Sequence, residues 1–325
     1  MIEAFYTDHF VLPLPHGHRF PMQKYRMLRD SLVENLSDIM MMEAPAATFG
    51  QLALAHCPRY IDRVMEGTLS PQEQKSIGFP WSPAMAERAK RSVGATIAAV
   101  RSAVQYGAAV NLAGGTHHSK RASGAGFCVF NDAIVASRVI QTDVLAQARE
   151  LSCRLRQPKV LMVDLDVHQG DGSAELAAGD DSLFTLSLHG ASNYPFEKAQ
   201  SDLDVPLPEG TGDQAYLDAL NAALAEVEQR FAPDLIIYLA GLDAHEEDRL
   251  GKLALTDAGI AARDACVFDW AAHWRVPVVM TMAGGYFKNL DRLVALQTEC
   301  IQRLVHYSRI SRPELSKQFK QRLMS

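Results

Sequence analysis

Short, mostly apolar runs alternate along the chain with longer segments in which apolar residues recur every three or four positions. Runs of strand length lie at 108–112, 159–163, 183–188, 235–239 and 276–282, and helical spacing lies at 24–37, 85–106, from 130 onward, 213–230, 256–272 and 290–306. Apolar strands that alternate with helices are typical of a parallel sheet with helices on both faces. There is no internal repeat, linker or low-complexity segment. We therefore predict one α/β domain over residues 1–325.

Three segments fall outside this alternation. Residues 12–21 are rich in proline and glycine, which predicts a surface loop whose His16 and His18 could line a substrate rim. Residues 191–212 contain turn formers and no long period, so we expect a rim loop there. The last twenty residues have a basic excess that predicts a solvated helix rather than a binding tail: Arg309, Arg312, Lys317, Lys320 and Arg322 against Glu314.

The stretch 163–172 concentrates polar groups at the end of an apolar run. If the strand continues to its polar end, Asp164, Asp166 and His168 leave the same face, because side-chain direction alternates along a strand. A divalent cation would neutralise this cluster, and its N and O ligands suit zinc or iron(II). Two glycines then allow a tight turn into a helix, with Asp171 facing the same pocket. The alternative is an ordinary strand-end turn with Asp caps.

Four apolar strands end in polar, glycine-flanked clusters: His117–His118, 164–171, Asp243 and Tyr286. A strand-end Asp is more often a cap than a ligand, and Gly-Gly-Tyr is usually a turn. In an open parallel sheet, however, ligands bind beyond the carboxyl ends of the strands. Four such clusters at the same ends of their strands therefore predict one shared pocket.

Composition narrows the class of protein. The chain has 325 residues, of which 48% are hydrophobic and 22% charged, as expected of a globular enzyme. A net charge of −6 argues against a general nucleic-acid binder, which needs a basic face. The N-terminus has no secretory pattern, and no apolar run approaches the roughly 20 residues of a membrane span. Five scattered cysteines without CxxC pairing fit reduced thiols in a cytoplasmic protein and exclude a Cys-type zinc site.

The polar clusters also carry a family resemblance. Residues 114–118, 124–128, 164–172, 240–243 and 284–286 resemble, in order and spacing, the motif set of the zinc-dependent histone deacetylase family. Gln169 and the segment 248–251 are most similar to its class IV branch and bacterial relatives. The resemblance implies an arginase-like, three-layer α/β/α sandwich with an eight-stranded parallel sheet. It also implies a deacetylase or deacylase, an amidohydrolase that acts on acyl-lysine.

The resemblance assigns the metal to Asp166, His168 and Asp243. Three protein ligands leave coordination positions for water and for the acyl carbonyl, as a catalytic zinc site requires. Relatives also bind a potassium ion near the same strand. That implies a second site formed by Asp164, Asp166, His168, Ser187 and Leu188.

By the same resemblance, His117 and His118 lie where a general base and a general acid are needed, with His118 as the proton carrier. Asp164 would orient His117 and Asp171 would orient His118. Class IV members commonly carry Asn in place of Asp171, so this departure should make His118 somewhat more basic. Tyr286 would donate its hydroxyl to the oxyanion of the tetrahedral intermediate.

The expected substrate tunnel is narrow. Phe127, after Gly126, resembles one wall, and the opposite wall should come from Tyr194 or Phe196. The glycines before the tyrosine, Gly284 and Gly285, complete the expected lining.

Other functions fit the sequence less well. A binuclear manganese ureohydrolase shares the fold but needs a further ligand where this chain has Gly170. An acetylpolyamine or other small acyl-amine deacetylase would use the same chemistry, and no obvious insertion narrows the entrance here. An inactive acyl-lysine-binding protein should lack a ligand, a histidine or the tyrosine, and none is missing. Acyl chain length, natural substrate and oligomeric state stay open.

Overall fold

A single eight-stranded sheet forms the centre of the computed structural model, which describes residues 1–15 and 17–324. Every pair of neighbouring strands is parallel, in the order β2-β1-β3-β8-β7-β4-β5-β6. The strands are β1 (Ile2–Tyr6), β2 (Ile39–Glu43), β3 (Ala108–Asn111), β4 (Val160–Asp164), β5 (Leu183–Gly190), β6 (Leu203–Leu207), β7 (Leu235–Leu239) and β8 (Val278–Thr281). The predicted α/β class and the eight-stranded parallel sheet are confirmed.

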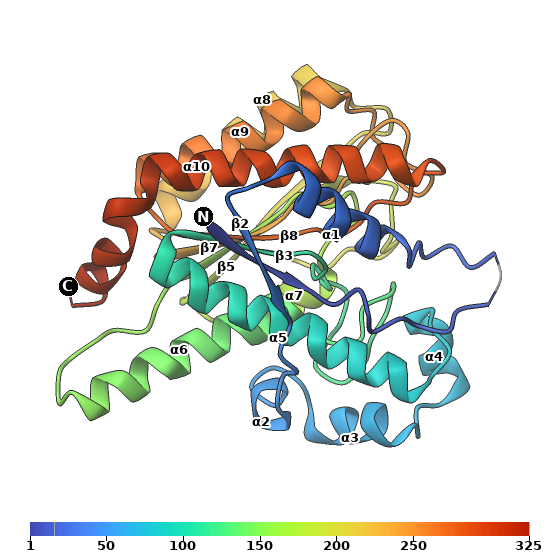
Figure 1. Cartoon of the computed structure of the whole chain (residues 1–325), viewed down its shortest axis with the longest axis horizontal. Coiled ribbons are helices and arrows are strands. Elements are labelled where there is room, and N and C mark those ends of the chain that lie inside the picture. The colour runs from blue at the N-terminus through green and yellow to red at the C-terminus, as the bar shows by residue number, and fades with distance from the viewer. Residues whose placement is uncertain (16, 325) are drawn as a thin grey trace.

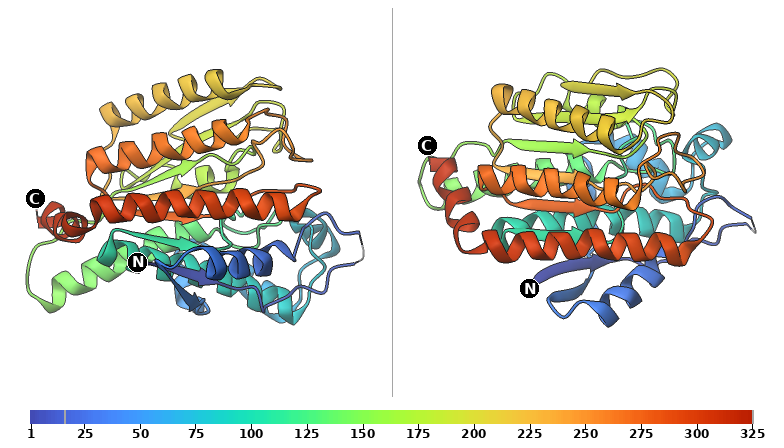
Figure 2. Two further views of the ribbon diagram at one scale, coloured as in Figure 1. Left: turned by 45° about the horizontal axis from the view of Figure 1, so that its top comes forward. Right: turned by 90° about the horizontal axis from the view of Figure 1, so that it is seen from above.

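Helices cover both faces of the sheet and make a three-layer sandwich (Figures 1 and 2). On one face lie α1 (Lys24–Asn35), α8 (Asp213–Arg230), α9 (Asp257–Trp274) and α10 (Leu290–Met324). On the other lie α2 (Phe49–Leu52), α3 (Pro58–Glu66), α4 (Pro71–Ile77), α5 (Pro83–Tyr106), α6 (Asp132–Glu150) and α7 (Asp171–Ala177). Each face packs its own hydrophobic core.

The double covering explains why most residues of the central strands are apolar. In β4, Leu161 and Val163 point into the core beneath α8–α10, whereas Val160 and Met162 point into the core beneath α5 and α6. Side chains alternate between the faces of a strand, so a strand buried on both faces needs apolar residues at every position. This is the physical basis of the continuous apolar runs in the sequence.

The ends of the predicted elements depend on local capping. Ser82 caps α5, because its Oγ accepts the backbone N–H of Met85 at 3.1 Å, and Pro83 occupies the first turn. Asn131 caps α6 in the same way through the N–H of Ile134 at 3.0 Å. The helices predicted from apolar periodicity at 24–37, 85–106, 213–230 and 256–272 are confirmed to within a few residues.

The structure corrects two predictions. The segment 191–212 is not only a loop, because it contains β6, paired with β5 at the edge of the sheet. Pro206 in β6 is tolerated because an edge strand has one side without a hydrogen-bonding partner. The final helix does not end near 306 but continues to Met324, where Leu323 packs into the core near α5 and α6.

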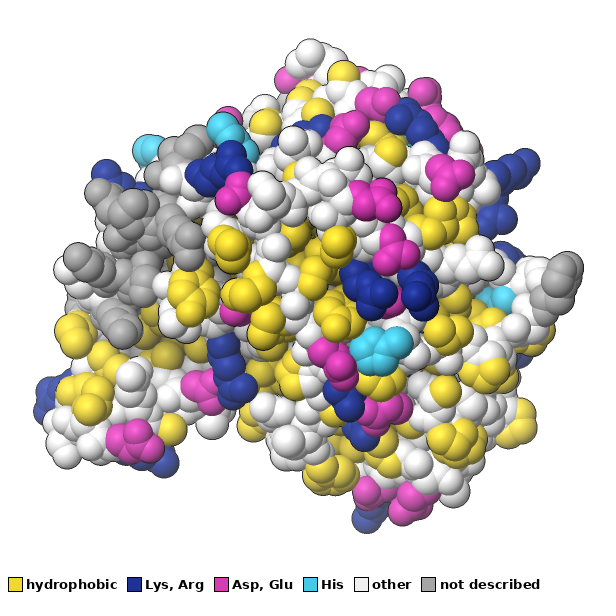
Figure 3. Space-filling view, in the orientation of Figure 1, with side chains coloured by type: hydrophobic (Ala, Val, Ile, Leu, Met, Phe, Trp, Pro, Cys, Tyr) yellow, Lys and Arg dark blue, Asp and Glu magenta, His cyan; other side chains and the backbone are white. Residues whose placement is uncertain are grey.

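Some predicted features lie outside the described residues: His16 and the side chains of Arg312, Glu314, Lys317 and Lys320. On the face seen in Figure 3, acidic and basic side chains are interspersed rather than separated by sign. No helix within the described part of the chain is long and apolar enough to cross a bilayer.

A buried histidine ties the loop before α6 to the helices beneath it. His56 is 1% exposed, its Nδ1 donates to the carbonyl of Lys120 at 2.9 Å, and its Nε2 accepts the N–H of Asn131 at 2.9 Å. Both partners require the neutral ring with its proton on Nδ1. Burial lowers the pKa of His56 from 6.5 to about 4, against the carbonyl of Lys120, which raises it.

We predict that His56 makes the fold sensitive to acid. Between pH 6.5 and 4 the unfolded chain takes up a proton that the folded chain does not, so the free energy of unfolding falls as the pH falls. At pH 5 this loss amounts to about 2 kcal/mol. The variant His56→Gln lacks this loss. The difference in free energy of unfolding between wild type and variant, measured by urea unfolding, should therefore shrink by about that amount between pH 8 and pH 5. The exposed His306→Gln serves as control, and a difference that stays constant with pH would refute the prediction.

Candidate metal and catalytic site

The polar clusters predicted from the sequence meet at the carboxyl ends of four adjacent strands, β3, β8, β7 and β4. His117, His118, Asp166, His168 and Tyr286 line one cavity of about 440 Å³. Asp243, the remaining cluster, does not line the cavity itself, but its carboxylate lies beside Asp166 and His168.

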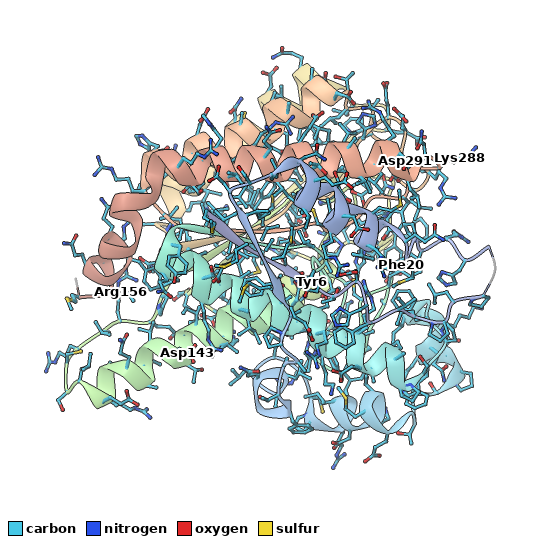
Figure 4. The ribbon with its side chains drawn as sticks, in the orientation of Figure 1. Tyr6, Phe20, Asp143, Arg156, Lys288 and Asp291 are labelled. Carbon is cyan, nitrogen blue, oxygen red and sulfur yellow. The ribbon has the colours of Figure 1, made fainter. Side chains whose placement is uncertain are left out.

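The cavity lies at one end of the molecule. In Figure 4, Phe20, which lines the cavity, is on the opposite side from Arg156, which pairs with Asp234 just before β7. The site thus lies at the carboxyl edge of the sheet. The loops there are not constrained by the hydrogen bonds between strands, so their conformations can vary.

Asp166, His168 and Asp243 form a compact set of possible metal ligands. One ligand atom from each lies within 4.8 Å of the others. Asp166 Oδ2 accepts the N–H of Gly284 at 2.8 Å, and Asp243 Oδ1 accepts that of Val167 at 2.9 Å, so the backbone fixes both carboxylates. Asp243 Oδ2 is buried without a hydrogen-bond partner among the described residues, although His168 Nδ1 lies 3.2 Å away.

The charges of this set call for a cation. Burial lowers the pKa of His168, but the carboxylates of Asp166 and Asp243 outweigh it and raise the pKa to about 10. Burial and the charge of Asp166 raise the pKa of Asp243 to about 7. The two carboxylates and the imidazole could all contact one ion, and Asp243 Oδ2 has no hydrogen-bond partner of its own within the described part of the chain. This arrangement fits a single divalent ion with N and O ligands.

The two histidines before α6 each contact a separate carboxylate. His117 Nδ1 lies 2.7 Å from Asp164 Oδ2, and His118 Nδ1 lies 2.7 Å from Asp171 Oδ1. Their rings are 4.2 Å apart between centroids. With each Nδ1 bound to a carboxylate, Nε2 is the nitrogen available for chemistry.

The two rings have opposite proton affinities. Burial lowers the pKa of His117, but Asp164 and Asp166 dominate and raise it to about 9. Burial and the neighbouring charge of His117 lower the pKa of His118 to about 4. Asp171 raises the pKa of His118, as expected, but its effect is smaller than these two.

Sequence reasoning missed the groups that hold Tyr286. Its N–H donates to Asp248 Oδ2 at 2.6 Å, and its carbonyl accepts from Arg249 Nε at 2.6 Å. The preceding carbonyl, that of Gly285, accepts from the buried Lys24 Nζ at 3.2 Å. These contacts join residues from 24 to 286, so no local pattern could have revealed them.

A further missed residue is Lys120. Its Nζ lies 3.3 Å from Asp171 Oδ2, so the carboxylate beside His118 also faces an ammonium group.

All but one of the residues expected along the tunnel line the cavity. Gly126, Phe127, Tyr194, Phe196 and Gly284 line the cavity, whereas Gly285 is not among the lining residues. Phe127 lies 6.0 Å from the ring of Tyr286, and Tyr194 stands edge-on to His118 at 4.9 Å between centroids.

The candidate potassium residues are neighbours but give no further indication of an ion. Asp164 is paired with Ser187 across β4 and β5, and Ser187 Oγ contacts His189 Nδ1 at 3.0 Å. The potassium site stays a prediction.

His18, the described histidine of the 12–21 loop, contacts the carbonyl of Gly78 through Nε2 at 3.0 Å, beside Phe127.

Comparison with known proteins decides the family. The model of the histone deacetylase domain matches residues 18–301. The chain belongs to the histone deacetylase family. It is 40% identical to an uncharacterized protein of Picosynechococcus sp. over 89% of this chain and 93% of that protein. It is 36% identical to histone deacetylase 2 of Arabidopsis thaliana over 66% of this chain but 53% of that protein.

Solved structures agree on the fold of this histone deacetylase family member. A structure of a histone deacetylase homologue complexed with SAHA superposes with a TM-score of 0.79, covering 98% of this chain and 88% of that chain, at 23% identity. The chain is therefore a member of a family of metal-dependent deacetylases with the arginase/deacetylase-like α/β fold.

Gly284 offers a test of the ligand set. A Cβ at this position would lie 1.8 Å from Asp243 Oδ2 and 2.7 Å from Asp166 Oδ2. Gly284→Ala should therefore displace both carboxylates and lower zinc affinity by at least about 100-fold, measured by competition with a zinc-binding dye, while circular dichroism stays unchanged. Gly50→Ala is the matched control, because a methyl group added at Gly50 would have no other atom within 4 Å. Zinc affinity equal to wild type in Gly284→Ala would remove these carboxylates from the site.

Proposed function

We propose that this chain is a zinc-dependent amidohydrolase that removes acetyl or longer acyl groups from acyl-lysine in peptides or proteins. The observation that carries the proposal is the grouping, around one cavity, of an Asp-His-Asp ligand set, two histidine–carboxylate pairs and a phenol. Any one of these has an ordinary structural explanation. Their combination matches the needs of amide hydrolysis, which requires a nucleophilic water, a proton carrier and an oxyanion donor.

Asp166, His168 and Asp243 would hold the metal. When bound, zinc polarises the acyl carbonyl and lowers the pKa of a water molecule, which makes that water nucleophilic near neutral pH. Iron(II) accepts the same donors, so the identity of the ion is part of the test.

His118 is suited to carry the proton. Its pKa lies below the ordinary value, so Nε2 is unprotonated near neutral pH and can accept a proton from the attacking water. The same nitrogen can then deliver that proton to the departing amine. Asp164 and Asp166 outweigh burial and raise the pKa of His117, which favours a positive charge beside His118, and such a charge would offset the negative charge that develops on the substrate.

Tyr286 is suited to donate a hydrogen bond to the oxyanion. Burial, with the charges of Asp166 and Asp243, raises the pKa of its phenol well above the ordinary value, so the hydroxyl stays protonated. Asp248 and Arg249 hold its backbone on both sides, so the donor is positioned before substrate arrives.

The cavity favours an apolar acyl group. Phe20, Phe79 and Phe127 form an aromatic cluster along its wall, with ring centroids 4.9 to 5.3 Å apart. The buried, apolar side chains of Leu12 and Met85 also line it. A volume of about 440 Å³ exceeds the needs of an acetyl group, so longer acyl chains have room.

The proposal is tested with chelator-treated protein. Zinc should restore acyl release from a panel of lysine peptides that extends from acetyl to myristoyl, with acetylpolyamines assayed beside them and iron(II) in place of zinc in a parallel series. Hydrolysis of peptides supports the proposal. Exclusive hydrolysis of acetylpolyamines would make acylpolyamines, rather than acyl-lysine, the substrate class. Zinc-loaded protein without turnover would indicate an inactive binding protein.

Tyr286→Phe should retain zinc but lose on the order of 100- to 1000-fold in kcat, because one oxyanion donor is removed. Tyr216→Phe is the matched control: this phenol is buried in α8, its hydroxyl has no hydrogen-bond partner among the described residues, and it does not line the cavity. The control should keep wild-type turnover. Undiminished turnover in Tyr286→Phe, measured as acetate release, would exclude Tyr286 from the reaction.

A further inference from the structure

The lining of the cavity combines aromatic rings with basic side chains. Tyr194 and the 85% exposed Phe196 line it, and their rings make an edge-to-face contact at 6.2 Å. Arg19 and Lys252 also line the cavity, and Arg249 lies in the same loop as Lys252. We refer to these three residues as the cationic side of the entrance.

Hydrogen bonds hold the cationic side in one arrangement. Arg249 Nε donates to the carbonyl of Tyr286 at 2.6 Å, and its Nη2 approaches the carbonyl of Arg19 at 3.5 Å, so the two loops lie against each other. Asn193 Nδ2 donates to the carbonyl of Leu250 at 2.9 Å, which ties the aromatic loop to the loop of Lys252.

These charges are largely uncompensated. Among the described residues, no carboxylate forms an ion pair with Arg19 or Arg249. Lys252 faces Glu209 at 3.6 Å, but both side chains are exposed, and such pairs contribute little. Asp248, the acidic residue of the same loop, points inward and accepts the N–H groups of Leu250, Gly251 and Tyr286.

Negative charge is scarce in the lining of the cavity. Asp166, a candidate metal ligand, is the one carboxylate among the described residues that line it. Glu209 beside Lys252 and Glu197 next to Phe196 are exposed and do not line the cavity. A substrate that enters therefore meets aromatic rings together with basic side chains, within a protein whose net charge is −6.

We infer that the cationic side binds a carboxylate of the substrate next to the acylated amine. The favoured substrate is an acyl-lysine flanked by Asp or Glu, whereas acyl-lysine among Arg and Lys residues, and the polycationic acylpolyamines, bind poorly because like charges repel at the entrance. The inference rests on the proposed deacylase function and specifies its substrate class. It concerns capture of the substrate, so it acts on KM and leaves the chemical step unchanged.

The test compares three peptides with the same acyl-lysine, flanked by Glu, by Ala or by Arg, together with an acetylated spermidine. For the zinc-loaded protein in low salt, kcat/KM should be roughly five- to tenfold higher for the Glu peptide than for the Ala peptide, through a lower KM, and lowest for the Arg peptide and the polyamine. The ratio should contract in 0.5 M salt, because exposed charges are screened.

The double variant Arg19→Gln/Lys252→Gln should bring the Glu-to-Ala ratio close to one. Arg149→Gln is the matched control, because Arg149 is an exposed arginine in the last turn of α6. That helix also bears Asp143, which Figure 4 shows far from Phe20. The control should keep the wild-type ratio.

The outcomes separate the two proposals. Equal kcat/KM for the Glu and Arg peptides, or a preference for the Arg peptide or the polyamine, would overturn the inference and leave the deacylase function standing. A ratio that survives in the double variant would also overturn it. No hydrolysis of any substrate by the zinc-loaded protein would overturn the proposed function and this inference with it.

Discussion

Two buried carboxylates, Asp166 and Asp243, converge on one imidazole, and the rest of the site depends on how their charge is compensated. Like charges in a low-dielectric interior repel strongly unless a cation lies between them. His168 takes part of that role, and the unpartnered Oδ2 of Asp243 leaves room for a divalent ion to take the remainder. The same carboxylate oxygens would bind the metal and shape this part of the site, so metal binding and local structure depend on each other.

The backbone around the site is built to hold these carboxylates in place. Gly284 and Val167 donate N–H groups to them, and the absence of a side chain at Gly284 makes the close approach feasible. Below, the fully buried Arg263 donates to the carbonyl of Gly241, two residues before the ligand Asp243. A charged group thus supports the ligand loop from the core, and it is itself neutralised by its neighbour Asp264.

The histidine side of the site has its own support. Asp132, in the first turn of α6, accepts the N–H groups of Gly115 and Thr116 and so fixes the loop that leads into His117. Tyr286 is held from a third direction by Asp248, Arg249 and Lys24. The candidate metal ligands, the proposed proton carrier and the proposed oxyanion donor are therefore held by separate sets of contacts, which preorganises them without relying on the substrate.

The amino-acid sequence by itself determined the alternation of buried strands and helices, because strands covered on both faces are mostly apolar, as in β7 and the first four residues of β4. It also determined which polar residues follow each strand, and parallel strands bring such residues to one edge of the sheet. The sequence pattern did not predict the edge strand β6. A half-exposed edge strand needs no apolar run, and Pro206 argued against a strand there. The tertiary structure alone decided that Lys24 and Arg249 hold Tyr286, that Lys120 faces Asp171, and that Arg19 and Lys252 share an entrance. Those contacts join loops far apart in the chain, and no periodicity or local spacing encodes the distance between them.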